Sequence, residues 1–223
     1  PVVAPTARKL SIADVFRPGL VHITVLVTLA YFFHITTFYF IMKWVPKIVT
    51  DFGFQASSAA GVLVWANVGG MIGGAVLGAP SQKFALKALT IGSMLVATVM
   101  VSLFAITPHD LTMLSAVCAA AGSFVNGAIV GMYALFAQAF PTHVRAFGTG
   151  CAVGLGRGGS FVAPIIAGYL FEAGFGLSTV AVTMALGSTM AAVVLLLLKI
   201  GSENLPQPAE QRMPSGKLKE ASA

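Results

Sequence analysis

The sequence predicts an all-α integral membrane protein in which six transmembrane helices form one bundle. Hydrophobic residues make up 57% of the 223-residue chain and charged residues only 9%, whereas soluble domains carry about 25% charged residues. Six apolar runs are each long enough to cross a hydrocarbon layer about 30 Å thick. The connections between these runs are short, so we expect neighbouring helices to run antiparallel.

The apolar runs divide the chain into three parts. Residues 1–18 contain three prolines and resemble the end of a cytoplasmic linker. Residues 19–200 hold the six predicted spans, at about 20–42, 57–79, 88–106, 111–137, 146–171 and 176–199. Residues 201–223 combine Pro, Gln, Glu, Lys and Ser, a composition that predicts a disordered cytoplasmic tail. The chain begins with Pro1 rather than Met, and we expect it to be a piece of a longer protein.

The basic residues predict the orientation of the spans. With residue 1 placed in the cytoplasm, ten of the 13 Lys and Arg residues flank cytoplasmic ends, two (Lys43 and Lys47) flank outer ends, and Arg157 lies within the membrane. Basic residues concentrate on the cytoplasmic side of membrane proteins, so both termini are predicted inside. The net charge of +6 then reflects topology, and we expect no nucleic-acid partner.

Arg157 is the most informative residue of the chain. At a helical rise of about 1.5 Å per residue it lies roughly 18 Å deeper than Arg145, near the middle of the hydrocarbon layer. An unpaired guanidinium in lipid costs on the order of 3 kcal/mol or more. We therefore expect Arg157 to face a protein interior or a wet cavity and to meet an anion there.

Other polar residues within the spans have two interpretations each. His34, with Tyr31 one turn before it, either contacts a ligand or is a neutral histidine bonded to a backbone carbonyl or a neighbouring hydroxyl. Asn126 and Tyr133 are seven residues apart, hence on one helix face, and either line a polar cavity or bond to neighbouring helices.

Glycine stripes mark two of the spans. The second span carries small-xxx-small pairs at 69/73, 70/74 and 74/78, and the fifth carries Gly150, Gly154 and Gly158 on one stripe. Such stripes allow close helix approach in lipid. They indicate either static packing within this bundle or a smooth surface toward another bundle, and Gly70, Gly74, Gly150, Gly154 and Gly158 are the candidates for that surface.

The sequence does not favour an enzyme or a cofactor. All seven Asp and Glu residues fall in loops or termini, and the sequence contains no G-x-S-G, CxxC or HExxH motif. Cys118 and Cys151 are expected to be small apolar residues rather than a metal or redox pair. We predict no cofactor and no metal.

Residues 140–150, Phe-Pro-Thr-His-Val-Arg-Ala-Phe-Gly-Thr-Gly, continue into Gly154-Leu-Gly-Arg157-Gly and on to Pro164. This stretch resembles the junction between the tenth and eleventh helices of major facilitator superfamily transporters, most closely the aromatic acid/proton symporter branch. Residues 122–135 are similar to that branch's tenth helix, and residues 44–46 to the end of its seventh. A loop signature of the superfamily is matched at Gly78, Lys83 and Lys87, while Gln82 and Ala85 depart from it.

The resemblance covers about residues 17–200, which correspond to helices seven to twelve of a twelve-helix carrier. It implies a partner, the missing N-terminal six-helix half, and a bacterial inner-membrane location. It implies proton-coupled uptake of a small organic anion, with Arg157, His34, Tyr31, Asn126 and Tyr133 as candidate contacts. Gly78, Lys83, Lys87 and Arg145 are implied to form a cytoplasmic gate. The alternative is a self-sufficient six-helix channel or a non-transporting membrane subunit.

Overall fold

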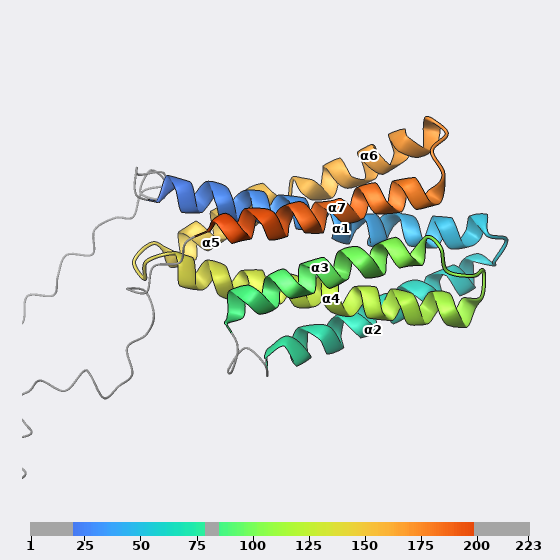
Figure 1. The fold of residues 1–223 in the computed structure, drawn as a ribbon, viewed down its shortest axis with the longest axis horizontal. Helices are drawn as coiled ribbons and strands as arrows, with labels where there is room; N and C mark the ends of the chain where they lie inside the picture. Colours follow the sequence, from blue (N-terminus) through green and yellow to red (C-terminus); the bar gives the residue numbers. More distant parts are fainter. Residues whose placement is uncertain (1–19, 79–84, 199–223) are drawn as a thin grey trace, which may run out of the picture.

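Seven helices make six membrane spans in the computed structural model, which describes residues 20–78 and 85–198 (Figure 1). Their bounds are α1 Val21–Asp51, α2 Ala56–Gly78, α3 Leu86–Phe104, α4 Leu111–Ala139, α5 Arg145–Gly156, α6 Gly159–Glu172 and α7 Leu177–Leu197. The six predicted spans and the all-helical class are confirmed. The predicted linker, the predicted tail and Lys83 lie outside the described residues.

The helices run along the long axis of one bundle (Figure 1). α2 packs mainly on α4, α3 packs on both α4 and α7, and α1 contacts α7, α5 and α6. The start of α1 and the end of α7 lie at the same end of the bundle, as six antiparallel spans require (Figure 1). We call this the inner end and the opposite one the outer end.

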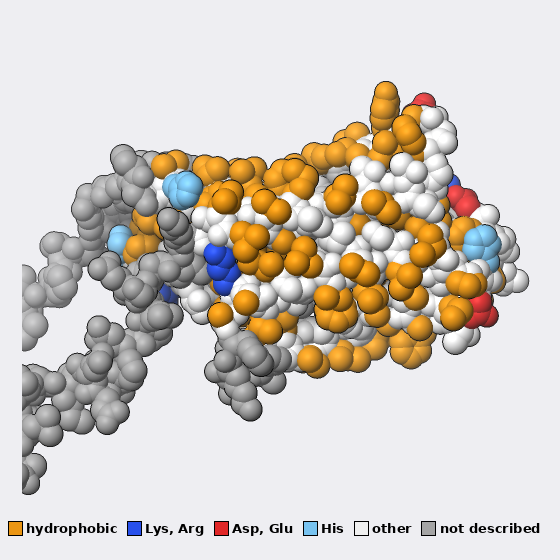
Figure 2. Space-filling model, in the orientation of Figure 1, with side chains coloured by type: hydrophobic (Ala, Val, Ile, Leu, Met, Phe, Trp, Pro, Cys, Tyr) orange, Lys and Arg blue, Asp and Glu red, His pale blue; other side chains and the backbone are white. Residues whose placement is uncertain are grey.

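Apolar side chains cover the long sides of the molecule, whereas charges gather at its two ends (Figure 2). The acidic residues of the described ranges are Asp51, Asp110 and Glu172, and each lies at the end of a helix or beside it. The interior of the described bundle therefore contains no carboxylate. An apolar belt between two polar ends is the distribution that a bilayer selects.

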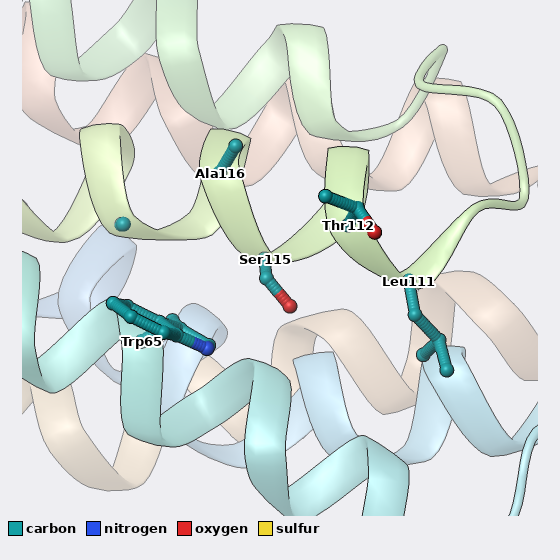
Figure 3. A pocket seen from close by; sticks show the side chains of 6 residues that line it. Trp65, Leu111, Thr112, Ser115 and Ala116 are labelled. Atoms are coloured by element: carbon teal, nitrogen blue, oxygen red, sulfur yellow. The ribbon is translucent and has the colours of Figure 1, made fainter.

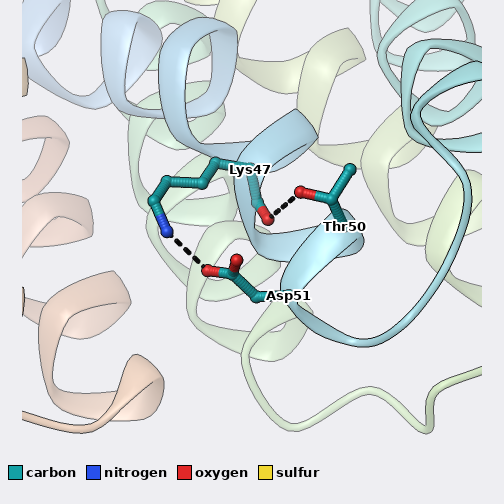
Figure 4. A network of polar contacts seen from close by, with 3 residues as sticks. All are labelled: Lys47, Thr50 and Asp51. Atoms are coloured by element: carbon teal, nitrogen blue, oxygen red, sulfur yellow. Dashed lines mark hydrogen bonds and ion pairs between the residues drawn. The ribbon is translucent and has the colours of Figure 1, made fainter.

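The first span is longer than the hydropathy predicts. α1 continues through Pro46 to Asp51, although the proline lacks the N–H that would bond to Met42. The residues around Pro46 hold the helix, because Val45 and Val49 are buried against the core. At its outer end Lys47 pairs with Asp51 at 2.7 Å, and the Thr50 hydroxyl donates to the Lys47 carbonyl (Figure 4).

The glycine-rich helix α2 packs against α4 of the same chain. A Cβ on Gly69 or Gly73 would overlap the backbone of α4, and Gly70 and Gly74 face the side chains of Asn126 and Val130. The Ser123 hydroxyl of α4 also donates to the Gly69 carbonyl, at 2.8 Å. Gly70 and Gly74 therefore lie at the α2–α4 contact, as the static-packing interpretation of this stripe expects, and a role toward another bundle stays a prediction.

The fifth span is broken in the middle. α5 ends at Gly156 and α6 begins at Gly159, and hydrogen bonds at the junction tighten to a spacing of three residues, as from Gly158 N to the Leu155 carbonyl at 3.0 Å. Pro164 removes a further N–H from the first part of α6. The glycines also lie against α1, where a Cβ on Gly156 would come within 2.7 Å of Tyr31 Cδ1. Arg157 is therefore at a helix break.

Candidate functional site

Arg157 caps the C-terminal end of α5 and is exposed on the surface of the bundle. The hydroxyls of Tyr31 on α1 and Tyr133 on α4 lie beside its guanidinium. Within residues 20–78 and 85–198, no carboxylate pairs with it. Arg157 is therefore left without an anion from the described residues.

The two tyrosines form one unit. Their hydroxyl oxygens are 2.8 Å apart and their ring centroids 5.8 Å apart, and the Tyr31 ring meets Phe136 edge-on at 6.1 Å. Tyr31 is only 1% exposed, whereas Tyr133 is 37% exposed. The ring of Tyr133, rather than that of Tyr31, is therefore open to a ligand beside Arg157.

His34 lies inside the bundle, with no exposed surface. Its Nε2–H donates to the Val125 carbonyl at 3.0 Å, and its Nδ1 is 2.9 Å from the Ser188 hydroxyl, which donates to it in the neutral form of the ring. This is the second interpretation of His34, a histidine satisfied by a carbonyl and a hydroxyl. His34 has no exposed surface in this structure, and its role as a substrate contact stays a prediction.

The Ser188 end of this network includes a second helix-to-helix bond. The Thr37 hydroxyl donates to the Met184 carbonyl at 2.8 Å and accepts from the Ser188 N–H at 3.0 Å, so it is inserted between a donor and an acceptor of α7. Sequence analysis did not single out Thr37 or Ser188. A hydroxyl on an apolar helix is a weak signal, because it can also bond to its own helix.

Asn126 is half-buried on the same face of α4 as Tyr133. Its Nδ2 donates to the Gly122 carbonyl at 3.1 Å within the helix and lies against Gly70 of α2. The amide group donates one hydrogen bond, and among the described residues the amide oxygen has no hydrogen-bond partner. Arg157, Tyr31 and Tyr133 are thus brought together, with Asn126 two turns away from Tyr133 along α4.

The glycines of the fifth span face different surroundings. Gly150 and Gly154 are exposed, and a Cβ on either would have nothing within 4 Å among the described residues. Gly158 is covered in part, since its Cβ would lie 3.5 Å from Phe32. Gly156, which sequence analysis left out, makes the close contact with Tyr31. Only its position next to Arg157 in the Gly-Arg-Gly motif could have indicated this role.

The predicted gate residues contact parts of this same chain. The Lys87 ammonium donates to the carbonyls of Leu198 at 2.7 Å and Leu196 at 3.1 Å, so it caps the end of α7. Arg145 begins α5, and its Nε is 3.5 Å from the Phe140 carbonyl. Gly78 is the last residue of α2. These bonds give Lys87 a role in stabilising its own bundle. A gate contact with another bundle is the alternative role.

A separate groove lies near the outer end, between α2 and the first turns of α4 (Figure 3). Its volume is about 480 Å³, and Trp65, Thr112 and Ser115 contribute its polar atoms while Leu111, Ala116 and Ala119 complete its lining. No charged side chain lines this groove. It therefore lacks the partner that an anionic ligand requires.

The sequence of this chain is similar to that of a known protein family. Residues 27–222 match the model of the Major Facilitator Superfamily. The chain belongs to this superfamily. The prediction that it is not an enzyme is thereby confirmed, since the superfamily consists of transporters.

Characterised relatives in the superfamily are named for aromatic acids. The chain is 31% identical to a 3-(3-hydroxy-phenyl)propionate transporter of Escherichia coli over 196 residues, which is 87% of this chain and 47% of that protein. It is 31% identical to a benzoate transport protein of Acinetobacter baylyi (60% of this chain, 28% of that protein) and 28% identical to a gallate transporter of Pseudomonas putida (78% and 38%).

These similarities confirm the predicted resemblance to the aromatic-acid branch. The chain nevertheless spans less than half the length of the relatives it matches. Arg157 is an exposed cation in the middle of the candidate span Arg145–Glu172.

Proposed function

We propose that this chain is the C-terminal half of a secondary carrier that takes up a small aromatic carboxylate together with protons. The observation that carries the proposal is Arg157, a permanent charge in mid-membrane, exposed at a helix break and without an anion among the described residues. Such a charge requires an anion. Because the relatives of this chain are named for aromatic acids, the simplest candidate for an anion that binds and is released is a substrate carboxylate.

The site has the parts that an aromatic carboxylate needs. A guanidinium presents a flat fork of N–H donors that matches two carboxylate oxygens. The exposed face of Tyr133 lies beside it and offers an apolar surface to a ring. Asn126 adds an amide on the same helix face. In this proposal Tyr31 and His34 support the site from inside the bundle and do not touch the substrate.

The partner in this proposal is a second six-helix bundle in the same membrane. Gly150 and Gly154 support it, because they leave a stretch of α5 that no residue of the ranges 20–78 and 85–198 covers. Small residues at such a surface let two bundles approach closely and slide, as alternating access around a midplane site requires. The acid that takes up the proton comes from that partner, since the described interior contains none.

We place this carrier in the bacterial inner membrane with both termini in the cytoplasm. Lys87 and Arg145 at the inner end support this orientation, because basic residues remain on the cytoplasmic side. Lys83 belongs to the same basic group by sequence. Together with Gly78, these residues also form the inner gate of the proposed carrier.

Replacing Arg157 tests the proposal directly. The natural protein that contains this chain is reconstituted into liposomes, and uptake of radiolabelled benzoate and 3-hydroxyphenylpropionate is followed with an imposed pH gradient. Arg157→Lys is expected to fold but to lose at least about tenfold in uptake, because a point charge does not reproduce the fork. Lys47→Arg, at the outer end of α1, is the matched control. Uptake by Arg157→Lys equal to that of the control would remove Arg157 from the site.

A further inference from the structure

We propose that Tyr133 donates a hydrogen bond directly to the substrate carboxylate, and that buried Tyr31 is the positioning residue that holds the Tyr133 hydroxyl in this direction. The inference rests on the proposed function and assigns separate roles within the same site. The groups that meet the carboxylate are then donors only, namely the Arg157 guanidinium and the Tyr133 O–H.

The direction of the hydrogen bonds follows from counting protons. The Arg157 guanidinium lies beside both tyrosine hydroxyls and can only donate, so it offers no acceptor for their protons. The two hydroxyls have one proton each, and the 2.8 Å contact between them uses one of the two. One hydroxyl proton therefore remains and must point away from this triangle.

Burial decides which proton remains. Tyr31 is 1% exposed, and the residues in the described ranges offer its hydroxyl no acceptor except Tyr133. If Tyr31 kept the free proton, a buried donor would be unsatisfied, which is costly. Tyr133 is 37% exposed and can direct its proton to the open side. The satisfied arrangement is therefore Tyr31 donating to Tyr133, with the Tyr133 O–H free for a ligand.

Tyr31 is fixed too firmly to meet a ligand itself. Its ring contacts Phe136 on α4 and lies against Gly156 on α5, where there is no room for a Cβ. The break after Gly156 therefore sets Arg157 and Tyr31 relative to one another, while Tyr133 completes the site from α4. Each bond in this chain of donors polarises the next, which strengthens the final O–H as a donor.

A site made only of donors selects by charge and by hydrogen-bonding type. A carboxylate has two acceptor oxygens and no donor, so it satisfies the guanidinium and the Tyr133 O–H together. The corresponding carboxamide has the same shape, but it directs an NH₂ group at one of these donors. We therefore expect strong discrimination between benzoate and benzamide, and we expect Tyr133 to provide part of it.

Tyrosine-to-phenylalanine variants test the inference in the natural protein in liposomes. Tyr133→Phe is expected to raise the KM for benzoate roughly ten- to hundredfold, the effect of losing a hydrogen bond to a charged group, with a smaller change in the maximal rate. Tyr31→Phe is expected to raise KM by a smaller factor. In the double variant the two effects should be clearly less than multiplicative, because Tyr31 positions the Tyr133 hydroxyl. Tyr169→Phe, 71% exposed on α6, is the control.

Inhibition of benzoate uptake by benzamide provides the second measurement. The preference of the wild type for benzoate over benzamide should fall in Tyr133→Phe and remain in Tyr169→Phe, a change that loosened packing alone does not predict. Multiplicative effects of the two substitutions, or a Tyr133→Phe variant that behaves as the control does, would overturn the inference. Tyr133 is at the surface, so its variant decides the question even if Tyr31→Phe fails to fold. Absence of benzoate uptake by the wild type would instead contradict the proposed function.

Discussion

The contact between α2 and α4 gives the sharpest test of the packing. Gly73→Ala places a Cβ 2.5 Å from Ser123 Cα, whereas ordinary contact begins at 3.4 Å. The Ser123 carbonyl oxygen is closer still. The obstacle is backbone, so no rotamer change relieves it, and the helices must separate locally by more than about 0.9 Å. Gly61 lies on the same helix and has nothing within 4 Å of an added Cβ. Gly61→Ala is therefore a matched control.

The expected magnitude follows from three contributions. Alanine in place of glycine stabilises a helix by about 1 kcal/mol, and this applies to both variants. In Gly73→Ala the overpacking costs about 1–3 kcal/mol. The bond from the Ser123 hydroxyl to the Gly69 carbonyl, at 2.8 Å, lengthens beyond hydrogen-bonding range, which costs about 1 kcal/mol more. Gly73→Ala should lower the free energy of unfolding by about 1–3 kcal/mol, and Gly61→Ala should leave it unchanged or raise it.

Titration of the micelle-bound protein with SDS, followed by circular dichroism or tryptophan fluorescence, measures both variants. Only the difference in midpoint between them is needed, because they share the change of residue type and the helix. If Gly73→Ala unfolds at the same SDS fraction as Gly61→Ala, then the helices do not approach each other at Gly73 and the close α2–α4 packing is wrong.

Two further predictions concern the interior and the bare surface. His34→Ala should lower the free energy of unfolding by about 2–4 kcal/mol, because it leaves a cavity and removes a partner from Val125 and Ser188. The same SDS titration measures this, with the exposed His143→Ala as control. Equal midpoints for the two variants would contradict the prediction. Gly154→Leu should unfold as the wild type does, since no described residue lies within 4 Å of an added Cβ. It should nevertheless stop uptake, because the leucine would obstruct the second bundle. Normal uptake would show that no second bundle packs there.

Several features of this protein are properties of short segments, and the sequence alone determines them. Whether a run of about 20 residues enters a membrane depends on the summed transfer free energies of its own side chains. Five of the six spans were therefore predicted to within a few residues. The depth of Arg157 follows in the same way from counting residues along the fifth span, and so does its need for an anion.

The extent of the first helix and the break in the fifth were not predictable in this way. Pro46 and the lysines around it indicate an end near residue 42, but α1 continues because Val45 and Val49 are buried by other helices. Hydropathy also cannot distinguish a continuous span from two half-helices. The separation of α5 from α6 lies where Gly156 packs closely against Tyr31, a residue far from it in the sequence.

The direction in which each polar or small residue faces was decided by the tertiary structure. The partners of His34 are 91 and 154 residues away from it, and they make it an interior residue. The glycines of α2 and α5 form similar stripes in the sequence. The α2 stripe contacts α4, whereas much of the α5 stripe contacts no described residue. Hydropathy is additive along a helix, whereas the face that a residue presents depends on which helices pack beside it. For that reason the sequence determined the spans and the deep charge, and only the packing decided which side chains surround it.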